Sequence, residues 1–224
     1  MNRIENWRQA DAEPQTLQSG RHTLSREEVL ASQRGRIMRA ALDELGELGA
    51  GGVTVGGLVE RAKVSKKTFY ENFAGLDECI AESLETVNLL VGAEIAAAAA
   101  AADPGVRFSR VAALVAELAA AAAEEPIVAT AILAAGFGLE DPKSASWHLF
   151  NTARQRIINA YYEADREALP DLPEASELKL VAAVGLMEQW LMRGLSSGTH
   201  QELPGQAAAV TSEMVAILSG GKYS

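Results

Sequence analysis

The chain has 224 residues, of which 48% are hydrophobic and 5% aromatic, with a formal net charge of -10. This length allows one large or two modest domains with a sizeable buried core. The alanine stretch at 96–102 lies between Glu94 and Asp103, so we expect no membrane span. The N-terminal residues lack the apolar segment of a signal peptide, and one cysteine, Cys79, excludes an intramolecular disulfide; both favour a cytoplasmic protein.

The charge is unevenly distributed along the chain. Residues 25–75 carry eight basic and seven acidic side chains, whereas residues 76–224 carry nine basic and twenty acidic ones. A local basic face matters more for contact with nucleic acid than the whole-chain sum does. The acidity of the chain therefore does not exclude DNA binding by residues 25–75, but the small excess predicts modest non-specific affinity.

Helix signals occur along most of the chain, and no sustained alternation of apolar and polar residues indicates strands, which predicts an all-α fold. Residues 1–24 have no periodicity and are expected to form a disordered extension. Ser25 and Glu28 form a capping box, so a helix should begin there and run to about Leu48. The alternative is that Gly35 divides this segment into two helices.

Two short helices are predicted next, one capped by Thr54 and ending near Arg61, the other capped by Ser65 and ending near Asn72. The second carries two lysines and a threonine-aromatic-aromatic run. A capped helix with cationic and small polar groups on one face suits insertion into the DNA major groove. The pair is therefore predicted to be a helix-turn-helix, and residues 25–75 a DNA-binding domain.

Six further helices are expected in residues 76–224, at about 76–102, 106–124, 126–136, 143–168, 174–196 and 205–219. Prolines and glycines lie between most of them. The alanine runs at 96–102 and 119–123 have two interpretations: compositional drift, or close approach of neighbouring helices.

Three segments carry a resemblance to a known family: RGRIMRAAL at 34–42, TV at 54–55 and ERAKVSKKTFYENF at 60–73. Over about residues 34–80 the chain resembles the tetracycline-repressor (TetR) family of bacterial regulators. The resemblance implies a three-helix DNA-binding head, a six-helix body at 76–224 that binds a small effector and dimerises, and double-stranded operator DNA as partner.

The resemblance also implies DNA contacts, at Arg36, Thr54, Lys63, Ser65, Lys66, Lys67, Thr68 and Tyr70. For Thr54 and Ser65 a plain helix cap is the alternative, and for the lysines a solvated surface. Lys63 stands where the family usually has a turn glycine, so we expect a positive φ there at a cost of about 1 kcal/mol. Lys67 stands at another position where glycine is common in the family. Leu76 stands where the family usually has a lysine that binds a phosphate.

By family position, the effector pocket would involve Phe108, Phe137, Trp147, Phe150, Asn151, Arg154, Tyr161 and Trp190. Core packing is the alternative for the apolar residues, and an exposed position for Asn151 and Arg154. The dimer would form through the helices near 174–196 and 205–219, using Leu180, Val184, Met187, Leu191, Val210, Met214 and Leu218. An intramolecular core would show the same spacing.

The function indicated is a DNA-binding regulator, a repressor that binds a palindromic operator as a homodimer and is released by a largely apolar small molecule. An activator, or a helical ligand-binding protein with weakened DNA binding, is the alternative. An enzyme is disfavoured because His22, His148 and His200 are scattered and Cys79 follows two acids. No cofactor and no metal site are expected.

Overall fold

The computed structural model describes residues 26–138, 145–169 and 171–221, with side chains from Val29 onward except at 136–153. Nine α-helices and two short 3-10 helices make up the regular structure of these residues, and they contain no strand. The chain divides into two compact units, Met1–Leu90 and Val91–Ser224, called here the head and the body. The all-α fold predicted from the sequence is confirmed.

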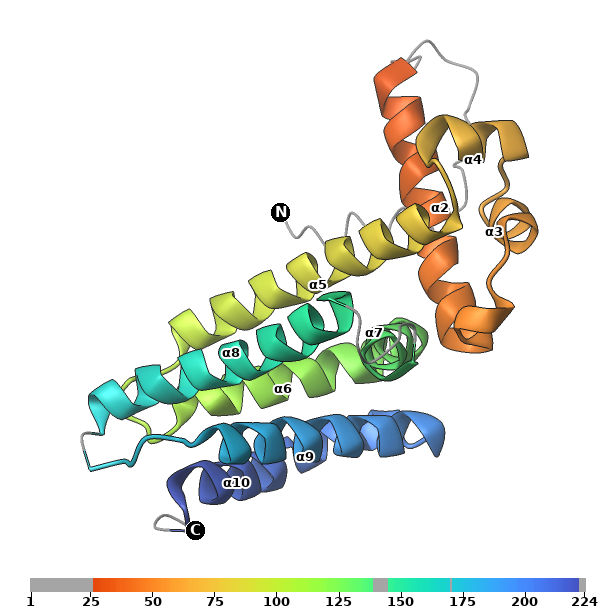
Figure 1. Ribbon diagram of the computed structural model, residues 1–224. Helices are drawn as coiled ribbons and strands as arrows, with labels where there is room; N and C mark the ends of the chain where they lie inside the picture. The colour runs from red at the N-terminus through yellow and green to blue at the C-terminus, as the bar shows by residue number, and fades with distance from the viewer. Residues whose placement is uncertain (1–25, 139–144, 170, 222–224) are drawn as a thin grey trace. The chain divides into compact units, whose positions relative to one another are not determined.

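The head is built on helix α2 (Arg26–Leu48), which continues through Gly35 without a break. A 3-10 turn, η1 (Ala50–Gly52), leads to α3 (Val55–Arg61) and α4 (Lys66–Asn72), which both pack against α2 (Figure 1). The head core contains fully buried residues from all three helices: Ile37, Leu42, Leu45, Leu58, Phe69 and Phe73. Leu48, the last residue of α2, is exposed.

Helix α5 (Leu76–Ala101) begins in the head and ends in the body, since the division at Leu90 and Val91 falls inside it. By length and composition α5 could cross a membrane, and so could α6 with residues 126–135 if that bent pair were one span. The sequence analysis expected no membrane span. These segments meet the length and composition criterion because their many alanines raise the mean hydropathy. Core helices of soluble proteins meet the same criterion, so the property indicates little.

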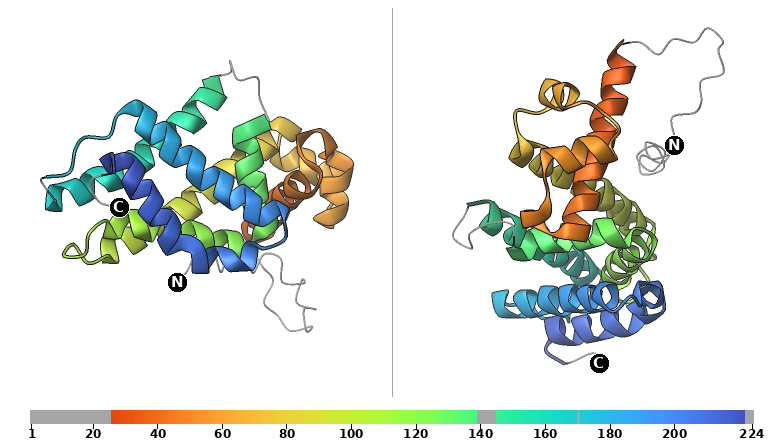
Figure 2. Two further views of the ribbon diagram at one scale, coloured as in Figure 1. Left: turned by 90° about the horizontal axis from the view of Figure 1, so that it is seen from below. Right: turned by 90° about the vertical axis from the view of Figure 1, so that its right-hand side faces the viewer.

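The body consists of the last part of α5 with α6 (Ser109–Glu124), α7 (Pro126–Gly138), α8 (Ala145–Ala168), α9 (Glu177–Ser196), η2 (His200–Glu202) and α10 (Leu203–Ser219). Helix α6 is central, because it packs against α7, α8, α9 and α10. Figure 2 shows α9 and α10 lying side by side, and the two helices are in contact.

The two alanine runs have different environments. Ala119, Ala122 and Ala123 of α6 are buried, and Ala119 and Ala122 belong to the body core. Their small side chains allow close approach of the helices that surround α6. Of the run in α5, Ala99 is buried while Ala96, Ala97 and Ala100 are exposed. Close helix approach therefore explains the second run and not the first.

Candidate DNA interface

Helix α3 begins at the threonine that the sequence predicted as its cap. The Thr54 hydroxyl oxygen accepts a hydrogen bond from the Gly57 N–H at 3.1 Å. Thr54 is exposed. Since Oγ1 acts here as an acceptor, its own hydrogen can be donated to an external acceptor. The cap and a phosphate contact are therefore compatible.

The turn between α3 and α4 contains Lys63 with φ +52°, as predicted from the missing glycine. The Val64 N–H donates to the Val59 carbonyl at 3.0 Å, and the Lys63 N–H donates to Glu60 at 3.2 Å. These bonds satisfy carbonyls at the end of α3 and require a left-handed residue between the helices. A lysine there costs about 1 kcal/mol relative to glycine and places an exposed ammonium in the turn.

Helix α4 begins at Ser65, whose hydroxyl accepts from the Thr68 N–H at 3.0 Å and lies 2.9 Å from the Thr68 hydroxyl. Phe69 is completely buried, with Tyr70 packed edge-on against it at a centroid distance of 5.2 Å. The Asn72 amide donates to the Thr68 carbonyl. The residues of α4 left exposed are Lys66, Lys67, Tyr70 and Glu71, a set called here the reading face.

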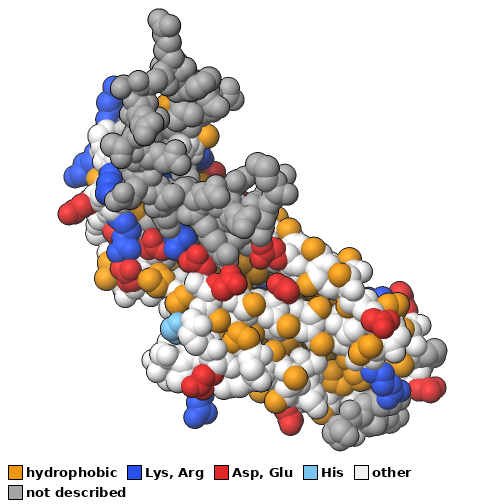
Figure 3. Space-filling model, turned by 180° about the vertical axis from the view of Figure 1, so that it is seen from behind, with side chains coloured by type: hydrophobic (Ala, Val, Ile, Leu, Met, Phe, Trp, Pro, Cys, Tyr) orange, Lys and Arg blue, Asp and Glu red, His pale blue; other side chains and the backbone are white. Residues whose placement is uncertain are grey.

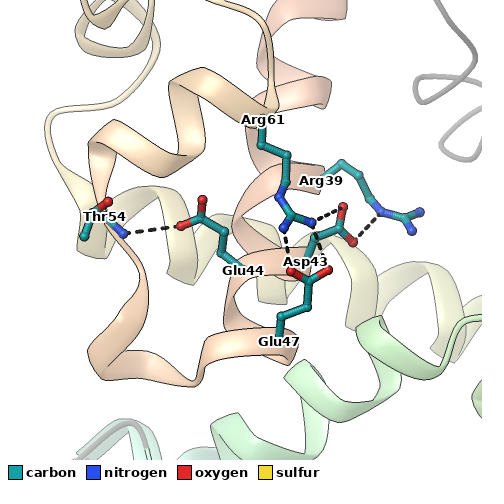
Figure 4. Close-up of polar contacts among 6 residues, drawn as sticks. All are labelled: Arg39, Asp43, Glu44, Glu47, Thr54 and Arg61. Atoms are coloured by element: carbon teal, nitrogen blue, oxygen red, sulfur yellow. Dashed lines mark hydrogen bonds and ion pairs between the residues drawn. The ribbon is translucent and has the colours of Figure 1, made fainter.

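Three of the four arginines whose side chains the structure describes in the head, Arg34, Arg39 and Arg61, pair with carboxylates of the head itself. Arg61 donates to both oxygens of Glu47, at 3.1 and 2.5 Å, and lies 3.8 Å from Asp43 (Figure 4). The hydrogen bond from Arg61 lowers the pKa of the Glu47 carboxyl. Arg39 pairs with the other oxygen of Asp43 at 3.0 Å. This chain of four residues fixes the end of α3 to α2, so Arg39 and Arg61 serve the fold.

Arg34 is the third paired arginine, and it is not among the predicted DNA contacts. It donates to both oxygens of Glu82 and to the Asn72 carbonyl, and its guanidinium lies 4.2 Å from the centre of the Phe73 ring. One side chain thus joins α2, the end of α4 and α5. The 48 residues between Arg34 and Glu82 conceal this pair in the sequence.

The cations of the described head that lack an acidic partner are Arg36, Lys63 and Lys66, while Lys67 lies 3.6 Å from Glu71 and stays 86% exposed. Arg36 is partly buried, and its Nε has no hydrogen-bond partner. On the face drawn in Figure 3, lysine and arginine side chains gather on the head, whereas uncharged side chains dominate the body. The residues predicted as DNA contacts therefore include each cation that is left without an acidic partner among the head side chains that the structure describes.

The start of α3 also holds a buried carboxylate that the sequence prediction missed. Glu44, only 5% exposed, accepts from the Thr54 N–H at 3.4 Å (Figure 4). A Cβ built on Gly57 would lie 2.8 Å from its carboxyl carbon, whereas one on Gly56 would meet nothing closer than the Thr54 hydroxyl at 3.8 Å. Gly57 therefore makes room for Glu44, and the packing gives no such reason for Gly56.

Of the predicted pocket residues, Phe137, Trp147, Phe150 and Asn151 lie outside the side chains that the structure describes. Phe108 is buried in the body core and has φ +56° just before α6. Tyr161 and Trp190 are partly buried against the same core, and the Trp190 indole N–H donates to Gln206 at 2.8 Å. These positions fit the core-packing alternative.

Arg154 is not at an exposed position, which was the alternative to a pocket anchor. It donates to the Glu188 carboxylate of α9 and, at 3.0 Å, to the Ile132 carbonyl of α7. The two side chains of the pair are 15% and 7% exposed, and burial lowers the pKa of Arg154. The pair joins three helices in the body.

The residues predicted for the dimer mostly serve the core of their own chain. Val184, Met187, Leu191, Met214 and Leu218 are buried in the body. This agrees with the intramolecular alternative for these five positions. The large apolar side chains of α9 that remain exposed are Leu178, at 77%, and Val181, at 45%.

Groups suited to catalysis are scarce in the described part of the chain. It contains no cluster of three metal-binding side chains. Burial raises the pKa of the Cys79 thiol to about 12, with smaller contributions from nearby acids. Burial, more than the acidic neighbours named from the sequence, therefore keeps Cys79 protonated at neutral pH.

Residues 37–82 match the family model described as bacterial regulatory proteins, tetR family. The fold is similar to that of a TetR-like transcriptional regulator from a Rhodococcus species (15% identity, 88% of this chain and 96% of that chain, TM-score 0.60). It is also similar to a TetR-family regulator from Streptomyces coelicolor, with 15% identity over 88% of this chain and 98% of that chain and a TM-score of 0.65. A transcriptional regulator from Pseudomonas aeruginosa has 18% identity over 86% of this chain and 93% of that chain, with a TM-score of 0.63. No curated protein matches the sequence.

Proposed function

We propose that this chain, which carries the DNA-binding head of the tetR family and has the fold of that family's regulators, is a homodimeric repressor released by a small molecule. The reading face of α4 carries the proposal. Lys66, Lys67 and Tyr70 are exposed there on a helix fixed to the core through Phe69. Lysines can donate to guanine O6 and N7 or to phosphates, and Tyr70 can donate to either class of acceptor.

The phosphate contacts would come from the residues around the reading face. Thr54 offers a hydroxyl at the start of α3, and Lys63 an ammonium in the turn. Ser65 and Thr68 bond to each other, so they serve first as the cap of α4. Arg36 is the remaining cation without an acidic partner among the described side chains of the head. Phosphate contacts position a protein on DNA, and base contacts select the sequence.

A dimer is needed for two heads to occupy successive major grooves, about 34–36 Å apart, on a palindromic site. Its interface would lie on α9 and α10, where the exposed Leu178 and Val181 support the assignment. The effector would be a small, largely apolar molecule in the body, and binding would favour one spacing of the heads over another. Such a regulator works in the cytoplasm, where the DNA is.

The experiment that tests this function is selection of bound sequences from random DNA by the full-length protein. Lys66→Ala/Lys67→Ala removes two cations of the reading face, and Arg107→Ala/Arg156→Ala removes the same charge from the body as a matched control. We expect a two-fold symmetric site for the native protein and the control, and none for the head variant. Failure of the native protein to enrich any site at low salt would overturn the proposal.

The alternative of a helical ligand-binding protein has one supporting observation. Arg34, Arg39 and Arg61 are all occupied by acids of the head, which leaves few cations for DNA. That alternative predicts a folded protein without enriched DNA. An activator would enrich the same kind of site as a repressor, and transcription from a promoter that carries the site distinguishes the two.

A further inference from the structure

The reading face contains one group that a DNA-binding surface would be expected to lack, the carboxylate of Glu71. Glu71 is the one acid in α4, and its side chain is half exposed. DNA phosphates repel such a group, so a carboxylate in this position lowers the affinity for DNA unless it meets a hydrogen-bond donor.

The stability of the head does not explain Glu71. Its ion-pair partner among the described residues is Lys67, at 3.6 Å and one helical turn away, and the lysine side chain is 86% exposed. An exposed i,i+4 pair of this kind contributes only about 0.3–0.5 kcal/mol. Both side chains can therefore leave the pair when DNA is present.

The donors that a major groove offers to a carboxylate are the amino groups of cytosine and adenine, and acidic side chains favour cytosine N4. Lys67 offers the opposite chemistry, since it can donate to the guanine acceptors. The two opposite charges lie one helical turn apart on α4 and would present complementary groups to a sequence that contains both bases.

We propose that Glu71 is a specificity-determining residue, which accepts a hydrogen bond from a cytosine amino group in each half-site and weakens binding to sequences without one. The inference rests on the proposed function, because it assumes that α4 lies in the major groove. It goes beyond that function by predicting which base one side chain selects.

The test compares the sites selected from random DNA by the native protein and by Glu71→Ala, Glu71→Gln and Glu60→Gln. Glu60 is exposed on α3, outside the reading face, so its variant controls for loss of one negative charge in the head. Glu71→Ala should lose one cytosine preference per half-site and discriminate roughly tenfold less against the other bases. Glu71→Gln should move the preference towards adenine, because glutamine pairs with adenine N6 and N7.

Binding to unrelated DNA supplies a second readout. Glu71→Ala should bind it several-fold more tightly than the native protein does, and Glu60→Gln should change this affinity less. Identical selected sites for the native protein and both Glu71 variants would overturn the inference while leaving DNA binding intact. If the native protein selects no DNA, the proposed function fails, and the inference fails with it.

Discussion

The head and the body both use arginine–carboxylate pairs to join helices, but they place these pairs in different surroundings. In the head, the Arg34–Glu82 and Arg61–Glu47 side chains are each about a third exposed. In the body, Arg154–Glu188 is almost enclosed, and Asp165, 2% exposed, accepts from the Val111 N–H and pairs with Arg110. The same chemistry therefore has different energetic consequences in the two units.

The difference also bears on function. Water weakens the exposed pairs of the head, so each contributes little by itself, and the small core needs several of them. The body has a large apolar core and uses its buried pairs to fix particular helices to one another. Among the described residues of the head, Arg36, Lys63 and Lys66 have no acidic partner, and the proposed DNA contact depends on these cations.

The largest effect is expected for the buried pair of the body. Arg154→Met or Glu188→Leu alone leaves one buried charge without its partner and should lower the free energy of unfolding by about 3–5 kcal/mol. The double variant should recover most of this loss, because both desolvation costs disappear. Urea unfolding of the three variants measures the difference. If the double variant were no more stable than the single variants, an unpaired buried charge would not be the cause of their lower stability.

Arg34→Met tests the strongest of the exposed junctions in the head. It removes two hydrogen bonds to Glu82, one to the Asn72 carbonyl and the contact with the Phe73 ring. We expect a loss of about 2 kcal/mol, measured by unfolding. Arg61→Met, which loses only the exposed pairs with Glu47 and Asp43, should cost about 1 kcal/mol or less. If Arg34→Met were as stable as Arg61→Met or more stable, the idea that Arg34 is the main junction between the helices of the head would be wrong.

Lys63 is expected to lower the stability of the head, through its positive φ, and to raise its affinity for DNA, through its ammonium group. Lys63→Gly should raise the free energy of unfolding by about 1 kcal/mol, because glycine tolerates the observed φ of +52°. Lys63→Ala keeps the strained backbone and should leave stability nearly unchanged. Both variants lose the ammonium group, so both should bind DNA more weakly than the native protein, and by the same factor. Thermal unfolding and DNA titration of this pair separate the two effects.

Adjacent glycines in α3 provide the smallest and sharpest test. Gly56→Ala should stabilise the head by about 0.5–1 kcal/mol, since its Cβ would make only an ordinary contact with the Thr54 hydroxyl at 3.8 Å and alanine favours helix. Gly57→Ala should gain less or lose stability, because its Cβ would displace the buried Glu44 carboxylate. In a Glu44→Ala background the two substitutions should become equivalent. A persistent difference there would assign Gly57 another role.

Local features of the head could be predicted from the sequence almost to the residue. Thr54 and Ser65 cap α3 and α4, and Lys63 has the left-handed backbone that its position in the turn predicted. Each depends on residues no more than a few positions apart, so local hydrogen bonding and sterics determine it.

Features that join distant segments could not be predicted in the same way. Glu44 and Gly57 come together only after α3 folds onto α2, and Arg34 meets Glu82 across 48 residues. The sequence shows how many cations the head has, but the fold determines which of them are neutralised. The same limit applies to α9 and α10, where helical spacing alone could not separate core residues from a dimer surface.

The most direct test of the account is the salt dependence of binding to a selected site. If each head of a dimer uses Arg36, Lys63 and Lys66 on phosphates, the slope of log K against log salt should be about -5, and Lys66→Met should reduce it by about 2. Arg61→Met should leave the slope unchanged, because Glu47 already neutralises that arginine. A loss of slope in the Arg61 variant equal to that in the Lys66 variant would contradict the division between structural and DNA-binding cations.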